Sequence, residues 1–202
     1  MMDTLFRLLK IIPFFLLVVP INGLAAVSVD VTLKNQTNTT QTNIPLTFGH
    51  VFKPGDVTAG ETLGAMLNGI SVPVQVDKKA TNADGSLRHA IITLRDPSLA
   101  ANTSDTVTLF NKLDSGSSGT VTQSQLLASN FDSVITLVIS GKPYTASARS
   151  MLQAGGAMTW LSGPMVSEWV VSAPFKDGGG INHPYLTARF NIRAYSGIDR
   201  VR

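Results

Sequence analysis

Cysteine is absent from this sequence of 202 residues. Disulfide bonds therefore cannot stabilise the fold, and a thiolate zinc site or a lipid-modified N-terminal cysteine is excluded. Charged residues are also sparse, because Asp, Glu, Lys and Arg together make up 14% of the chain. Stability must come from an ordinary hydrophobic core, which a chain of this length can form.

Residues that usually carry catalysis or metal binding are equally scarce. Glutamate occurs only at Glu61 and Glu168, and no facing pair of carboxylates of the kind that cleaves glycosidic bonds is evident. His50, His89 and His183 are far apart in the sequence, and none has a further ligand at metal-binding spacing. Lys and Arg form no cluster interleaved with aromatic residues, which argues against nucleic-acid binding. The residues themselves predict no catalytic site, no cofactor and no metal.

The N-terminus has the pattern of a secretory signal peptide. The apolar run from Ile11 to Val19 follows two basic residues and precedes Gly23-Leu24-Ala25, which places small residues where signal peptidase cleaves. An uncleaved anchor is the alternative, but Pro20 and Asn22 end the run short of the roughly 20 residues that span a bilayer. We expect residues 1–25 to be removed, leaving a secreted, periplasmic or cell-surface protein with no membrane association after cleavage.

The clearest structural signal lies between Ile70 and Arg95. Val72, Val74 and Val76 alternate with other residues, as in a strand with one buried face. Asp84-Gly85 then separates this strand from a second apolar run, and this dipeptide favours a tight hairpin turn in which the glycine has positive φ. An antiparallel hairpin is therefore predicted here.

Similar patterns along the rest of the chain predict an all-β fold. A loop is predicted at 34–43, a strand end at Asp96-Pro97, and helical propensity is best at 123–132. We expect an antiparallel sandwich or partly open barrel with several hairpins and at most one short helix. It would form a single domain over residues 26–202. The start of another strand near Arg202 predicts the N-terminal part of a longer protein. Further strands are predicted at 27–33, 44–57, 63–68, 106–110, 134–139, 144–149, 165–173 and 185–195.

The aromatic residues allow two interpretations. Trp160, Trp169, Tyr144, Tyr185 and Tyr195 are candidates for a platform on which sugars stack. The more common role of such residues in a β-protein is to fill the core. Both interpretations stay open at the level of the sequence.

Several segments, in order, resemble the N-terminal domain of the exo-rhamnogalacturonan lyase-like family of secreted polysaccharide lyases. Residues 44–55 (IPLTFGHVFKPG) resemble its P-x-x-F-G-x-x-F-x-x-G pattern. Residues 74–77 (VQVD) and 84–88 (DGSLR) resemble its Q-x-D and D-G-S-x-R/K-W hairpin, although His89 stands where the family has tryptophan. His183-Pro184, entering a long strand, also fits the family.

The resemblance implies a RIFT-type β-domain that precedes a helical catalytic toroid in a longer protein. It implies a non-catalytic accessory domain of an exported carbohydrate-active protein, whose partners are a polysaccharide or a downstream catalytic domain. The alternative is a stand-alone binding or adhesion module that uses loops such as 34–43 and 177–182. Arg88, His89, Trp160, Trp169 and Tyr185 are the candidate contacts with carbohydrate or with a neighbouring domain.

Overall fold

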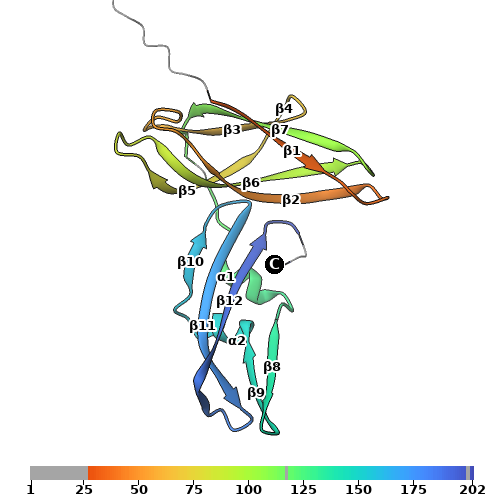
Figure 1. Cartoon of the computed structure of the whole chain (residues 1–202), viewed down its shortest axis with the longest axis vertical. Helices are drawn as coiled ribbons and strands as arrows, with labels where there is room; N and C mark the ends of the chain where they lie inside the picture. Colours follow the sequence, from red (N-terminus) through yellow and green to blue (C-terminus); the bar gives the residue numbers. More distant parts are fainter. Residues whose placement is uncertain (1–26, 117, 199–200) are drawn as a thin grey trace, which may run out of the picture.

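The computed structural model describes residues 27–116, 118–198 and 201–202. The predicted signal peptide lies outside the described residues. Two lobes follow one another along the chain, a first lobe of strands β1–β7 and a second lobe that contains strands β8–β12 and two helices (Figure 1). The described residues form antiparallel sheets and two short helices, so the predicted all-β fold is confirmed as a sandwich, with no closed barrel among them.

The first lobe consists of two facing sheets. Leu63 of β3, Leu109 of β7 and Ile92 of β6 are fully buried in one cluster between the sheets. Val72, Val74 and Val76 pack against this cluster, as the alternation predicts. One sheet has the order β1 (Ser28–Lys34), β7 (Ser104–Leu113), β3 (Glu61–Leu67), β4 (Ile70–Val72), and the other has the order β2 (Gln41–Val51), β6 (Leu87–Leu99), β5 (Val74–Thr81).

The predicted hairpin joins β5 to β6. Gly85 has a φ of 82°, which confirms the predicted positive φ. The Asp84 carboxylate accepts hydrogen bonds from the Ser86 hydroxyl (2.6 Å) and the Ser86 N–H (3.0 Å). Ser86 Oγ in turn accepts a hydrogen bond from the Gly55 N–H (3.0 Å). The turn is therefore tied to the Pro54-Gly55 turn that follows β2.

The second lobe is built on the long hairpin of β11 and β12. Its main core forms where Trp169, Ile192 and Leu152 meet, and a smaller one forms around Phe175. The predicted helical segment forms α1, which begins with a capping box of Thr122 and Gln125. The elements are α1 (Gln123–Ala128), β8 (Val134–Ile139), β9 (Lys142–Ser147), α2 (Ala148–Gln153), β10 (Met158–Leu161), β11 (Val166–Asp177) and β12 (Asn182–Tyr195).

Three local predictions are wrong. A second helix, α2, begins where Ser147 ends the strand and caps the helix, since its side chain accepts a hydrogen bond from the Ser150 N–H. Strand β6 continues through Pro97, which is tolerated because only β2 pairs with this end of β6. The loop predicted at 34–43 is confined to residues 35–40, because β1 ends at Lys34 and β2 begins at Gln41.

The two lobes meet at a joint on the outer face of the β2–β6–β5 sheet. The Gln75 side chain, 3% exposed, accepts hydrogen bonds from the N–H groups of Met165 (2.9 Å) and Val166 (3.0 Å). It also donates to the Val166 carbonyl (2.9 Å). Tyr195 Oη lies 3.1 Å from Thr47 Oγ1 at the same joint. This sheet is consequently covered on both faces there.

Candidate functional site

The structure does not bring the five predicted contact residues together. Arg88 and His89 lie at the start of β6 in the first lobe, whereas Tyr185 is 88% exposed on β12 at the far end of the second lobe. Trp169 is 3% exposed in the core of the second lobe. A side chain so deeply buried cannot stack on a sugar, so the prediction of Trp169 as a surface contact is wrong and its core-filling role is confirmed.

Two of the predicted residues have local structural partners. Trp160 is 42% exposed, but the Lys79 ammonium lies over its ring, 4.4 Å from the ring centroid, and donates to its carbonyl. A cation–π contact of this kind occupies a face that a sugar would need. His89 lies over Gly49, where an added Cβ would come 3.1 Å from His89 Nε2. Glycine at position 49 therefore leaves room for the imidazole.

Tyr185 belongs to a row of three rings, which we call the aromatic row. The His183 ring lies between the other two, with its centroid 4.8 Å from that of Tyr144 and 6.3 Å from that of Tyr185. Both contacts are edge-to-face, as aromatic pairs prefer. The row crosses from β9 to β12 at the end of the second lobe remote from the joint (Figure 1).

Hairpin turns position the aromatic row. Ser140 and Gly141 have φ values of 50° and 77°, so the β8–β9 hairpin closes in two residues and fixes the start of β9. In the β11–β12 turn, Asp177 Oδ1 accepts hydrogen bonds from the N–H groups of Gly179 (3.0 Å) and Ile181 (2.8 Å). His183 Nδ1 accepts from the N–H groups of Tyr185 and Leu186, so the imidazole carries its proton on Nε2 when neutral.

An ion pair ties the two hairpins to each other beside the row. Lys142 Nζ lies 2.6 Å from Asp177 Oδ2 and 5.5 Å from the centroid of the Tyr144 ring. The hydrogen bond from Lys142 lowers the pKa of Asp177, and the same contact raises the pKa of Lys142. Both groups are thus charged at neutral pH. The Lys142 side chain is 55% exposed beside the aromatic row, whereas the Asp177 side chain is 7% exposed and is occupied by the ion pair and by the turn.

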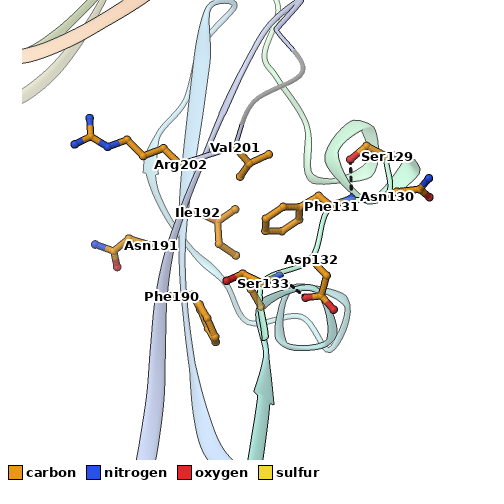
Figure 2. Close-up of a pocket in the computed structure, with 11 residues that line it drawn as sticks. Ser129, Asn130, Phe131, Asp132, Ser133, Phe190, Asn191, Ile192, Val201 and Arg202 are labelled. Carbon is orange, nitrogen blue, oxygen red and sulfur yellow. Dashed lines mark hydrogen bonds between the residues drawn. The ribbon is translucent and has the colours of Figure 1, made fainter. Parts of the chain in front are cut away.

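An open groove elsewhere on the second lobe encloses about 500 Å³. Figure 2 shows Phe131, Ile192 and Val201 pointing into it, with Asp132 and Ser133 along one side. Asp132 is held by the Ser147 hydroxyl (2.9 Å) and the Arg149 N–H (3.0 Å). Burial raises the pKa of Asp132, but the hydrogen bonds outweigh it and lower the pKa overall. This carboxylate joins β8 to α2 and is not poised to accept a proton.

No family model, curated protein or solved structure matches the chain. Among the described residues, no three His, Asp or Glu side chains gather where they could hold a metal ion. No helix in the described part of the chain has the length and apolar character needed to cross a membrane.

The sequence predicts the two ends of the aromatic row but not its centre. Tyr144 and Tyr185 are candidates for a sugar platform, whereas the sequence predicts no aromatic contact for His183. The three residues come from two hairpins that are distant in sequence. The available signal was the pair of tight turns, at Ser140-Gly141 and around Gly178 to Gly180, each flanked by an aromatic strand end.

Proposed function

We propose that this chain is a non-catalytic β-module of an exported carbohydrate-active protein, and that it binds a polysaccharide through the aromatic row. The observation that carries the proposal is the exposure of Tyr185 in a row with two further rings. An aromatic side chain that is 88% exposed gains nothing for folding from its apolar surface. It is available to stack on the apolar face of a sugar.

The surroundings of the row suit a saccharide. Lys142 supplies an exposed donor beside the rings, and the turn ends in the exposed Asn182, whose amide can both donate and accept. Binding sites for small polar ligands combine apolar surface with a few placed polar groups in this way. The resemblance to the lyase-like family points to a pectin-type polymer as the ligand.

Titration of the protein with pectin-derived oligosaccharides, followed by two-dimensional NMR, tests the proposal. We expect shifts at residues 142–144 and 183–185, and loss of binding in Tyr185→Ala. Trp160→Ala is the matched control, because it removes another exposed aromatic ring that lies outside the row. Binding that survives Tyr185→Ala but not Trp160→Ala, or no binding to any acidic or neutral oligosaccharide, would contradict the proposal.

The same proposal assigns catalysis to another part of the protein. Incubating the purified chain with a pectin-type polysaccharide should release no unsaturated sugar above a heat-treated control. Ultraviolet absorbance of the unsaturated product provides the measurement. Activity that disappears on heating would show that the chain itself is a lyase.

A second candidate function is that of a binding or adhesion module for a protein partner. This is the alternative that the sequence left open. Ile181, 67% exposed, lies in the turn next to Tyr185 and favours this candidate. The other loop named for this role, 34–43, is held by internal hydrogen bonds. The buried Asn35 amide donates to the carbonyls of Thr39, Leu99 and Ala100. Pull-down with Ile181→Asp as the variant distinguishes the two, since a saccharide contact on Tyr185 does not require Ile181.

A further inference from the structure

Strand β8 lies at the end of its sheet, and the described residues provide no partner for its outer edge. Its sequence, VITLVI, contains no charged residue, no proline and no glycine. Val134 and Val138 on one face are 56% and 69% exposed, and Ile135 and Ile139 on the other face are 40% and 36% exposed. A strand that is apolar on both faces is typical of the interior of a sheet.

The free hydrogen-bonding groups of this edge follow from the pairing with β9. The Ala148 N–H donates to the Ser133 carbonyl (2.9 Å), so this pair points inward, toward β9. Pairs in an antiparallel ladder alternate in direction, so the groups of residues 135, 137 and 139 also point inward. The N–H and C=O groups of Val134, Thr136 and Val138 therefore point outward along the open edge.

The other outer strands carry features that discourage pairing. Charged residues, prolines, bulges and short length protect exposed edges from association. These features are Asp30 and Lys34 in β1, Pro45 in β2, a three-residue length in β4, Lys78 with a bulge in β5, a bulge in β10, and Pro184, Arg189 and Arg193 in β12. Strand β8 has none of them. An unprotected apolar edge indicates a surface that is normally covered.

We infer that β8 pairs with β8 of a second copy of this chain, antiparallel and about a two-fold axis at Thr136. In this register Thr136 faces its own equivalent, Val134 faces Val138 and Ile135 faces Leu137. The outward groups then form three pairs that each exchange two backbone hydrogen bonds, on the order of six in all. Every cross-strand pair is apolar or Thr–Thr, and such pairs stabilise a sheet.

A second copy fits this edge better than an unrelated peptide because the strand is complementary to itself. With no charge in VITLVI, two antiparallel copies bring no like charges together. The two-fold axis stands perpendicular to the sheet, so the core face of one copy continues into the core face of the other. The inference is independent of the proposed function, since no residue of the aromatic row takes part in it.

Sedimentation velocity over a range from micromolar to millimolar protein tests the pairing. We expect a monomer–dimer equilibrium, and Thr136→Lys should weaken dimerisation by about tenfold or more because it places two ammonium groups on the axis. The matched control is Val51→Lys, which adds the same charge at a similarly exposed valine (67%) on the edge of β2. It should leave dimerisation unchanged.

Amide hydrogen exchange identifies the surface. The N–H groups of Thr136 and Val138 should exchange more slowly as the concentration rises, and this protection should be lost in Thr136→Lys. A protein that stays monomeric at every concentration overturns the inference. So does a dimer in which these two amides remain unprotected, because it would use another surface.

Discussion

Gly163 lies against the side chain of Gln75, and a Cβ at position 163 would overlap the Gln75 carboxamide. Gly163→Ala should therefore displace this side chain and weaken the joint, lowering the free energy of unfolding by about 1–3 kcal/mol. Gln75→Ala should cost a similar amount, about 1–3 kcal/mol, because it leaves the N–H groups of Met165 and Val166 without their acceptor. Urea unfolding measures both values.

A double variant isolates the contact between the two residues. Once Gln75→Ala has removed the carboxamide, Gly163→Ala has space for its Cβ and should add little further cost. The two free energies should then fail to add. Strict additivity would mean that Gly163 is required for a reason other than its contact with Gln75.

Gly85→Ala should destabilise the protein by about 1–2 kcal/mol, because a φ of 82° is unfavourable for a residue with a Cβ. Gly178→Ala is the matched control. Its φ is not in the left-handed region, and an added Cβ meets no atom within 4 Å. Thermal melts compare the two variants. A control variant as unstable as Gly85→Ala would contradict a specific requirement for glycine at the turn.

Asp96 should make the protein less stable as the pH rises. Burial raises the pKa of this fully buried carboxyl above 3.8, the Ser98 N–H lowers it, and the charge of Asp105 raises it further. Its Oδ2 has no donor among the described residues. The folded state holds a proton that the unfolded chain has lost, so stability falls as pH rises from 3.8 through the raised pKa. Asp96→Asn should remove this fall in stability. At pH values above the raised pKa, the variant should be more stable than the wild-type protein.

Unfolding across a pH series checks this, with Asp84→Asn as a control of opposite sign. The hydrogen bonds from the hydroxyl and N–H of Ser86 lower the pKa of Asp84. The contribution of Asp84 to stability is therefore fully present above pH 3.8, and it is lost as the pH falls through the lowered pKa. Parallel pH profiles for the wild-type protein and Asp96→Asn would show that folding does not raise the pKa of Asp96.

Export of the protein should remove residues 1–25, because the apolar run ends in Gly23-Leu24-Ala25. N-terminal sequencing of protein recovered from outside the cytoplasm should begin at Ala26. Ala25→Arg places a bulky charge at the cleavage position and should leave the leader attached. Exported material that still starts at Met1 would contradict the prediction.

Local sequence patterns were sufficient for most strands and for the first hairpin. The alternation around Val74 and the Asp84-Gly85 turn depend on neighbours within a few residues, and both were predicted correctly. The helix at Ala148–Gln153 was missed because its residues continue the pattern of the preceding strand. Its first turn is defined by the Ser147 cap and by Asp132, which is distant in sequence and accepts from the Arg149 N–H.

The joint and the aromatic row could not be predicted because each is assembled from distant segments. Gln75 occupies the polar face of a strand with an apparently clear alternation, yet it is buried. The second lobe covers it with residues 165–166, about ninety positions away in sequence. His183 becomes the centre of the row only because the β8–β9 hairpin places Tyr144 beside it. Periodicity carries no information about either contact.

The joint also determines how the molecule responds to force. The second lobe extends away from the sandwich and is held at one end through Gln75, Thr47 and Arg95 (Figure 1). It is therefore a lever arm, with the aromatic row at its free end. A sideways pull at that end exerts its largest torque on a few side-chain hydrogen bonds at the joint. In the long β11–β12 ladder, by contrast, the force is distributed over many backbone hydrogen bonds. We therefore expect the two lobes to separate at the joint before the sheets of either lobe unfold.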